Sequence, residues 1–323
     1  MNLATLKKVI REFDEKSSAV AASYEAGIGK FRVTCSMLYC LLRYGARPID
    51  YERFEFHRKS GRERSRYMTF LRYFKIARRI DSHTFHDISG NKIRELEVFA
   101  DFINRDWLAV DSSTDEKTIR AFVENHPKLI AKPQHGEQGK GIFRITDDCG
   151  LERLLSERKV TPFLLEEFVE NADYIKAINP SSLNTIRAYT FIDRNGHVNI
   201  LTVMLRAGAP GAVVDNWGAG GVGYNFDLST GICDQPGKDK KNRCYLHHPG
   251  SNIKMIGFNI KDFDALKDYV KRLALIMPKA RFVGWDIAIT PNGFELIEMN
   301  CPGGHDFLQS YGKPVYKFFI RNW

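Results

Sequence analysis

Three oxygen-bearing side chains near the end of the chain have the types and spacing of a metal site. The stretch 284–300 predicts two strands joined by a tight turn at Pro291-Asn292-Gly293. Glu298 and Asn300 are two residues apart, so a strand directs both side chains to one face, and Asp286 can lie opposite them in a hairpin. Hard cations such as Mg²⁺ prefer oxygen ligands of this kind. The alternative is a solvent-facing strand whose polar residues bind nothing.

A lysine followed by a glycine-rich stretch indicates a phosphate-binding loop. Lys132 ends a predicted strand, and the glycines are Gly136, Gly139 and Gly141. Glycine lets backbone N–H groups approach phosphate oxygens closely, and a lysine on a strand adds a positive charge for the same oxygens. The alternative is a plain exposed hairpin tip.

The segment Glu166-Glu167-Phe168-Val169 predicts a strand that leads into a linker. Such a segment can offer backbone donors and acceptors to the edge of an adenine ring, while apolar side chains cover the faces of the ring. Asp173 follows and could bind ribose hydroxyls. The alternative for Asp173 is an ordinary loop carboxylate in solvent.

Two arginines lie in predicted strands. Arg187 is inside an apolar strand that begins next to Asn184, and Arg206 ends the following strand. An arginine among apolar residues needs a charge partner, and two of them suit a phosphate or a developing oxyanion. We expect Asn184, Arg187 and Arg206 to be the catalytic residues. The alternative is that each arginine pairs with a local carboxylate.

The elements that position these residues belong to two predicted domains. Apolar residues at helical spacing predict a basic helical domain over residues 1–107. Short strands, turns and helices follow over residues 108–323 and predict the α+β class. Within this second domain we expect a lid subdomain at about 111–166 and an antiparallel-sheet subdomain at about 167–323.

Composition restricts the class of protein. The chain has 323 residues and is 43% hydrophobic, which is enough for a substantial core. No apolar run approaches the ~20 residues of a membrane span, and the charged N-terminal segment predicts no signal peptide. The six cysteines have no zinc spacing, and reduced thiols are expected. These features predict a cytoplasmic protein.

The positive charge is concentrated in the N-terminal third. The net charge is +9, and residues 1–110 contain 21 Lys and Arg against 14 Asp and Glu. The densest part, 58–79, also contains several aromatic residues. The simplest interpretation is a solvated basic helix face. Other interpretations are contact with an anionic membrane surface or a polyanionic substrate; no nucleic acid is expected, because no binding motif accompanies the charge.

The combined motifs resemble the ATP-grasp superfamily over roughly residues 108–310. The final D-x(11)-E-x-N pattern, followed by Cys-Pro-Gly-Gly at 301–304, is similar to the metal-site strand of D-alanine–D-alanine ligases. The detailed pattern is most similar to the sugar-transfer-associated ATP-grasp family, which is found with surface-polysaccharide gene sets. The segments that carry this similarity are S-S-x-N-T-x-R at 181–187, V-D-N-W-G-A-G-G at 214–221, H-H-P at 247–249 and G-W-D-I-A-I-T at 284–290.

The resemblance implies roles for individual residues. It implies ATP and Mg²⁺ as cofactors, with two ions and with Mn²⁺ as a substitute. The implied ATP contacts are Lys132, Gly136, Gln138, Gly139 and Gly141 for the phosphates, Glu166, Glu167, Phe168 and Val169 for adenine, and Asp173 for ribose. The implied metal ligands are Asp286, Glu298 and Asn300, and the implied catalytic residues are Arg187 and Arg206. Two departures from the superfamily are the helical N-terminal region and Gly284, where D-alanine ligases have an arginine.

The activity implied by the resemblance is an ATP-dependent carboxylate–amine ligase that forms an amide through an acyl phosphate. Its small-molecule partners would be an amine or amino acid and a sugar acid or related carboxylate of surface-polysaccharide biosynthesis. The alternatives are a small-molecule kinase and a catalytically silent ATP-binding scaffold of a sugar-transfer complex. Peripheral membrane contact through the basic N-terminal region is a further expectation.

Overall fold

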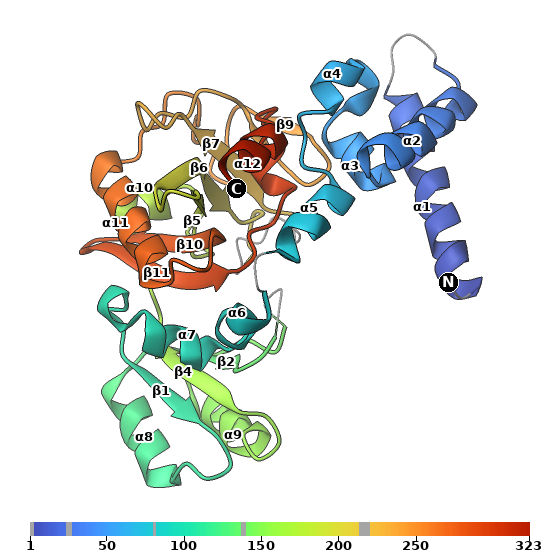
Figure 1. The fold of residues 1–323 in the computed structure, drawn as a ribbon. Coiled ribbons are helices and arrows are strands. Elements are labelled where there is room, and N and C mark those ends of the chain that lie inside the picture. The colour runs from blue at the N-terminus through green and yellow to red at the C-terminus, as the bar shows by residue number, and fades with distance from the viewer. Residues whose placement is uncertain (1–2, 24–27, 80–81, 137–139, 213–219) are drawn as a thin grey trace. The chain divides into compact units, whose positions relative to one another are not determined.

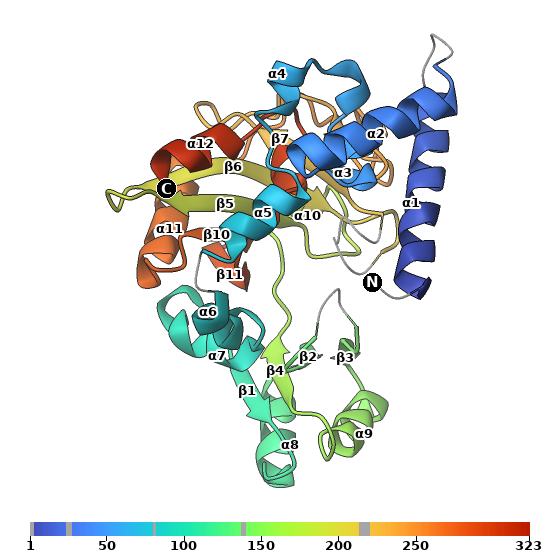
Figure 2. The ribbon, with the colours of Figure 1, turned by 45° about the vertical axis from the view of Figure 1, so that its right-hand side comes forward.

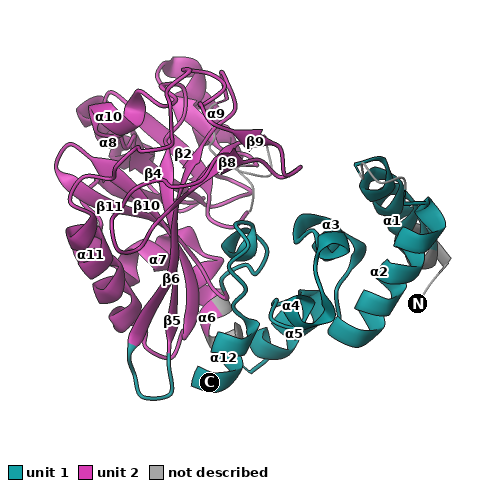
Figure 3. Ribbon diagram, turned by 90° about the horizontal axis from the view of Figure 1, so that it is seen from above, with its two compact units in different colours: residues 1–81, 193–197, 303–323 teal, residues 82–192, 198–302 magenta. Residues whose placement is uncertain are grey.

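The computed structural model describes residues 3–23, 28–79, 82–136, 140–212 and 220–323. The chain divides into two compact units (Figure 3). Unit 1 comprises Met1–Asp81, Asp193–His197 and Gly303–Trp323, and unit 2 comprises Ser82–Ile192 and Val198–Pro302. The domain boundary expected at residue 107 does not coincide with this division and stays a prediction. None of the described helices is both long enough and apolar enough to cross a membrane.

Unit 1 is helical and combines both ends of the chain. Its α-helices are α1 Leu3–Ala22, α2 Lys30–Tyr44, α3 Pro48–Arg53, α4 Gly61–Arg64, α5 Phe70–Ala77 and α12 Tyr316–Asn322. Two 3-10 helices, η1 Phe56–Arg58 and η4 Phe307–Gln309, complete it.

The core of unit 1 forms on one face of α2. Val33, Met37, Cys40 and Tyr44 recur at helical spacing, and all four are buried. They pack with aromatic side chains of the segment that follows, which are Tyr51, Phe54, Phe56 and Tyr67. Full burial of a large apolar side chain contributes about 2 kcal/mol, so this cluster is a main source of stability for unit 1.

Hydrogen bonds of buried polar groups attach the C-terminal segment to the N-terminal helices. The Gln309 side chain accepts from the Met68 N–H and donates to the Met68 carbonyl, both at 2.8 Å. Buried Asp50 accepts from the Phe70 N–H at 2.9 Å, and its other oxygen lies 3.1 Å from His305 Nε2. Because each of these groups is buried, loss of one partner would leave an unpaired polar atom in the core.

Unit 2 begins with three short helices and a four-stranded sheet. The helices are α6 Ser82–Ser89, α7 Lys92–Val98 and the 3-10 helix η2 Ala100–Phe102. The strands are β1 Trp107–Val110, β2 Leu129–Pro133, β3 Phe143–Ile145 and β4 Phe163–Glu167, in the antiparallel order β1-β4-β2-β3.

Side chains alternate across this four-stranded sheet and give it two different faces. Leu129, Ala131 and Leu165 belong to the core formed with α8 Glu116–Asn125 and α9 Asp148–Glu157, which lie beside the sheet (Figure 1). The intervening residues point to the other face. Cross-strand pairing places Ile130 beside both Arg144 and Glu166, and Lys132 beside Leu164, on that second face.

The second sheet of unit 2 has seven strands in the order β11-β10-β5-β6-β7-β8-β9. Their bounds are β5 Thr185–Ile192, β6 Val198–Ala207, β7 Val222–Phe226, β8 Gly237–Lys238, β9 Cys244–Tyr245, β10 Phe282–Thr290 and β11 Gly293–Asn300. Helix α11 Phe263–Ile276 packs on β5 and β6, while α6 and α7 pack against β11 (Figure 2). Helices with antiparallel sheets confirm the expected α+β class.

The terminal hairpin that the sequence predicts forms between β10 and β11. Asp286 of β10 lies directly opposite Glu298 of β11, and Gly284 lies opposite Asn300. A break in register follows Asp286, so the two ends of the hairpin are not in simple alternation.

The segment between β4 and β5 has a polar core. It includes the short helix α10 Asp173–Lys176. Asn184 is fully buried, and its side-chain amide donates to the carbonyls of Ile175 and Asn179, both at 3.0 Å. Asn171 accepts from the Asn184 N–H at 2.7 Å and donates to the Asn184 carbonyl at 2.9 Å. The asparagine pair therefore fixes where β5 starts.

Replacing Asn184 with alanine should lower the free energy of unfolding of unit 2 by about 2 kcal/mol, because two buried carbonyls lose their donor. Urea unfolding followed by circular dichroism measures this loss. The matched control is Asn292→Ala in the exposed turn between β10 and β11, which should change stability by no more than about 0.5 kcal/mol. Unchanged stability of Asn184→Ala together with lost turnover would instead support the catalytic role predicted for Asn184.

Candidate active site

Asp286 is held by the two arginines that were predicted to be catalytic. It is 2% exposed. Arg187 of the neighbouring strand donates from Nε at 2.5 Å and from Nη2 at 2.8 Å to the two carboxylate oxygens, and Arg206 Nη2 lies 3.0 Å from the second oxygen. Burial by itself would raise the pKa of Asp286, but Arg187 and then Arg206 outweigh it, and the pKa is lowered. Asp286 is therefore an ionised carboxylate fixed by three strands.

Glu298 and Asn300 provide the other two side chains that were predicted to bind the metal. Burial, followed by the charge of Asp286, raises the pKa of Glu298. Asn300 directs its amide nitrogen toward Asp286 at 3.5 Å, which leaves the amide oxygen as an acceptor. Two neighbouring carboxylates and an amide oxygen are the donor set of a hard divalent cation, whose charge would relieve their mutual repulsion. The residues thus fit Mg²⁺, with Glu298 and Asn300 better placed than Asp286, whose second oxygen already accepts from both arginines.

A cavity of about 80 Å³ next to Glu298 is lined by three lysines. They are Lys92, Lys132 and Lys140, and Gly136 lies in the same wall. Lys92 Nζ donates to the Gly136 carbonyl at 2.9 Å. Burial lowers the pKa of Lys92, and Glu298 partly opposes this. Cations gathered beside carboxylates suit the phosphate groups of a nucleotide with its metal ion, although 80 Å³ is smaller than the ~300 Å³ that a whole ligand of this size needs.

Lys92 and Lys140 are functional candidates that were not among the predicted site residues, and Lys92 lies outside the motifs altogether. It occupies the first position of α7, directly after the capping residue Asn91, whose side chain accepts from the N–H groups of Ile93 and Arg94. A cation at a helix N-terminus opposes the helix dipole, so a lysine there weakens the helix. A lysine at such an unfavourable position is the signal by which the sequence could have indicated a functional role for Lys92.

Glu95, one turn further along α7, lies at the back of the same cavity. Its carboxylate is buried and accepts from the Met299 N–H at 2.5 Å. Burial and then the nearby Glu298 raise its pKa well above the usual value. Glu95 thereby ties α7 to β11 between the two proposed metal ligands of that strand.

A buried chain of charges joins Lys132 to the seven-stranded sheet. Lys132 forms an ion pair with Glu166. Arg105 donates from Nε to Glu166 at 2.9 Å, and from Nη1 to Glu295 at 2.7 Å and to the Leu296 carbonyl at 2.8 Å. Burial alone would raise the pKa of Glu166, but Arg105 and then Lys132 lower it to about 2. The Glu166 side chain is thus occupied by Lys132 and Arg105, and the adenine contact predicted for this segment would fall to its backbone.

The segment after β4 lies at a second cavity, of about 440 Å³. Phe168 and Val169 form part of its wall, and the Arg144 guanidinium lies 4.7 Å from the centre of the Phe168 ring. Lys128 and Lys176 contribute positive charge and both pair with Glu170, at 2.8 and 3.0 Å. An aromatic ring, apolar side chains and cations in one cavity suit a nucleoside.

The other predicted residues are placed differently. Asp173, predicted for ribose, lines a separate cavity of about 580 Å³ with Tyr174 and Asp262. Asn184 is buried in the segment before β5 and lines none of these three cavities. Gly141 has a φ of +75° and lies against Pro133, where a side chain would clash. Gln138 and Gly139 lie outside the described residues.

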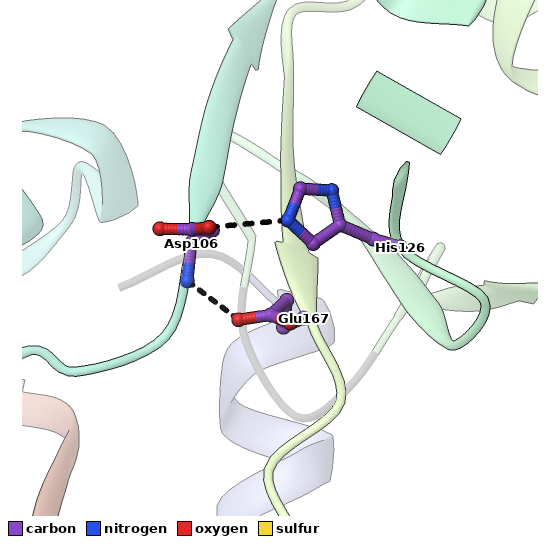
Figure 4. A group of neighbouring side chains, drawn as sticks. All are labelled: Asp106, His126 and Glu167. Carbon is purple, nitrogen blue, oxygen red and sulfur yellow. Dashed lines mark hydrogen bonds and ion pairs between the residues drawn. The ribbon is translucent and has the colours of Figure 1, made fainter. Parts of the chain in front are cut away.

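Glu167 belongs to a second group of candidate metal ligands, with Asp106 and His126 (Figure 4). His126 Nδ1 donates to the Phe122 carbonyl at 2.8 Å, and Nε2 lies 3.1 Å from Asp106. The Asp106 N–H donates to the Glu167 carboxylate at 2.8 Å. The hydrogen bond to the Phe122 carbonyl and the nearby Asp106 raise the pKa of His126. A protonated imidazole that bridges the carbonyl and the carboxylate explains this group without a metal.

Replacing Glu166 with glutamine should destabilise unit 2 in a pH-dependent way. The pKa of Glu166 is about 2 in the folded protein, below the ~4.3 of an unfolded glutamate, so its contribution is complete above about pH 5 and disappears as the pH falls toward 2. We expect a loss of about 3 kcal/mol at pH 7 that shrinks in acid. Urea unfolding at several pH values measures it.

The control for this substitution is Glu170→Gln, which removes a solvent-accessible ion-paired glutamate four residues further along. Its effect should stay below about 1 kcal/mol at every pH. A difference between wild type and Glu166→Gln that does not vary with pH would contradict the buried charge chain.

Comparison with solved structures gives several distant similarities. The ATP-grasp ligase PsnB, complexed with minimal precursor, Mg and ADP, is 14% identical with a TM-score of 0.43, over 72% of this chain and 59% of that one. D-Alanyl-alanine synthetase A from Vibrio cholerae O1 is 13% identical with a TM-score of 0.46, over 72% and 63%. This chain therefore spans less than two thirds of either protein. No curated protein matches it.

The match to a protein family is more informative. The family model for sugar-transfer associated ATP-grasp proteins matches residues 150–315, from α9 to the C-terminal segment. This range contains Arg187, Arg206 and the whole hairpin of β10 and β11. It amounts to 166 of the 323 residues, and it confirms the predicted ATP-grasp fold. This protein belongs to the sugar-transfer associated ATP-grasp family.

Proposed function

We propose that this protein is an ATP-dependent ligase that joins a carboxylate to an amine through an acyl phosphate. The observation that carries the proposal is the cavity where Lys92, Lys132 and Lys140 meet Glu298 at the end of the hairpin. Membership of the ATP-grasp family supports it, since the matched residues 150–315 include the D-x(11)-E-x-N pattern, whereas the role of Lys132, which precedes this range, rests on the resemblance of the sequence motifs.

The nucleotide is proposed to lie along the second face of the four-stranded sheet, the one that carries Lys132. Strands β2 and β4 run antiparallel, so Lys132 and the Phe168 segment mark opposite ends of this face. The lysine-lined cavity would take the phosphates, and the larger cavity at Phe168 and Val169 would take the adenosine. Glu170 is in that second cavity, and we propose it in place of Asp173 as the carboxylate for the ribose.

The proposed reaction has two steps. The substrate carboxylate attacks the γ-phosphate of ATP, which gives an acyl phosphate and ADP; the amine then displaces phosphate and leaves an amide. Lys92, Lys132 and Lys140 would neutralise the charge that moves onto the departing ADP and hold its oxygens in line. Mg²⁺ held by Glu298, Asn300 and one oxygen of Asp286 would supply Lewis-acid stabilisation of the phosphoryl group.

Arg187 and Arg206 serve this site first by fixing Asp286. Both guanidinium groups reach the same carboxylate from neighbouring strands, β5 and β6. They keep it ionised although it is buried. We also propose that Arg187 or Arg206 contacts the acyl phosphate directly. This contact would need a guanidinium N–H group other than those that hold Asp286.

The substrates are proposed from the family description alone. The name links the family to sugar transfer, and we propose a sugar acid as the carboxylate and an amino acid or amine as its partner. Two Mg²⁺ ions are expected, as the carboxylates of the hairpin can be shared between metals, and Mn²⁺ should substitute. The setting would be surface-polysaccharide biosynthesis in the cytoplasm.

Replacing Glu298 with glutamine should lower ATP turnover by about 100-fold or more, since one metal-binding charge is lost without a change of shape. Turnover is measured as ADP formed in the presence of Mg²⁺ and pooled amino acids and sugar acids. Glu97→Gln, an exposed glutamate on α7, is the matched control and should keep full turnover. Full turnover in Glu298→Gln would refute the metal assignment.

The kind of product decides between ligase and kinase. With hydroxylamine as a trap, an acyl phosphate gives a hydroxamate, ADP and phosphate, which mass spectrometry identifies together with the trapped acid. A stable phosphorylated compound and ADP would show a kinase and contradict the proposal. Bound MgATP without turnover on any pool would favour the silent scaffold.

A further inference from the structure

Helix α2 in unit 1 has two apolar stripes on opposite sides. One stripe is Val33, Met37, Cys40 and Tyr44, and it is buried in the core of unit 1. The other consists of residues at the same spacing of i, i+4, i+7 and i+11, which are Phe31, Cys35, Leu38 and Leu42. At 100° per residue the two stripes lie about 160° apart, so they cannot share one core.

The second stripe is exposed along its whole length. Phe31 is 82% and Leu42 87% exposed, and Leu38 and Cys35 are exposed as well. The stripe is about 16 Å long, since it spans eleven residues at 1.5 Å each. Helices α1 and α3 pack against α2 (Figure 2), and the stripe stays exposed beside them. An exposed apolar row of this length marks a surface that binds a partner.

Positive charge borders the stripe. Arg32 and Arg43 are exposed and lie in the row next to it, together with half-exposed Tyr39, and Lys30 lies on the opposite border with an ion pair to Asp14 at 2.5 Å. An amphipathic aromatic residue beside cations is typical of a helix at a membrane interface.

The surrounding segment has a strong excess of cations. Residues 28–79 contain 14 Lys and Arg against 4 Asp and Glu, a net charge of +10, so the rest of the chain sums to −1. Nine of these cations are exposed, whereas Glu63 is the single exposed acid in the same stretch. A partner for this region must therefore offer both an apolar surface and negative charge.

We infer that the exposed stripe of α2 inserts into the headgroup region of an anionic lipid bilayer, with Arg32 and Arg43 on lipid phosphates. Phe31, Leu38 and Leu42 bury their apolar surface at the level of the acyl chains, while the helix lies in the plane of the membrane. Negative lipids attract the remaining exposed cations of the segment. The contact brings the protein to the membrane surface without a spanning helix.

A second copy of the chain fits this surface less well. Pairing two α2 stripes would place two segments of charge +10 side by side, and like charges across an interface oppose association. A bilayer surface with acidic headgroups supplies the opposite charge and a flat apolar layer at once.

Flotation of the full chain with vesicles tests the inference. We expect it to float with vesicles of phosphatidylcholine containing 30% phosphatidylglycerol, and to float at least tenfold less with pure phosphatidylcholine. Raising the salt to about 0.5 M should weaken the binding, since surface charges are then screened. Absence of flotation with the anionic vesicles would overturn the inference.

Two double variants identify the surface. Phe31→Ser with Leu42→Ser should lower flotation at least tenfold, and Val160→Ser with Leu246→Ser, which removes two exposed apolar side chains of unit 2, should not. All four positions are exposed, and thermal unfolding checks that the variants stay folded. Equal flotation of both variants would overturn the inference. A concentration-dependent dimer in light scattering that the α2 variant dissociates, without vesicle binding, would show a second copy instead.

Discussion

The buried guanidinium of Arg105 is the interaction on which the geometry of the candidate site depends. It bonds at once to Glu166 of the four-stranded sheet and to Glu295 of the seven-stranded sheet. A charge this deeply buried is tolerable only with its partners in place, and removal of one partner from such a pair costs about 3–5 kcal/mol. The two sheets of unit 2 are thus attached at a point beside the cavity. Lys132, which pairs with the same Glu166, takes its position from this attachment.

The same electrostatic arrangement recurs around the hairpin. Asp286 is ionised in the interior because Arg187 and Arg206 reach it from two adjacent strands. Glu298 and Glu95 lie nearby, and burial, followed by the charge of the neighbouring carboxylate, raises the pKa of each. The site therefore holds more carboxylate than the surrounding side chains neutralise, which is the condition in which a divalent cation binds most favourably.

Features that follow from local periodicity could be predicted from the sequence, and features that depend on distant partners could not. The hairpin follows from the period of two and the Pro-Asn-Gly turn, but the pairing of Asp286 with Glu298 does not, because without the register shift after Asp286 this residue would lie opposite Ile297. The pairing of Arg187 with Asp286 joins strands about a hundred residues apart, and the sequence left open whether each arginine meets a phosphate or a carboxylate. Asp173 lines another cavity because α10 begins there, and Lys92 carries no motif of its own. Asn184 resembles a strand-start catalytic residue in sequence, but its amide is used by neighbouring carbonyls.

Unit 1 is assembled from segments at both ends of the chain, and this affects the order in which the protein folds during synthesis. Met68 emerges from the ribosome long before Gln309, its hydrogen-bond partner 241 positions later. At the usual 5–20 residues per second, the N-terminal helices wait roughly 10–50 s for the segment that completes their packing. During that interval the residues of unit 2 are already available to fold. Unit 1 is therefore finished last, and the helices made first are those that most need protection from aggregation during synthesis.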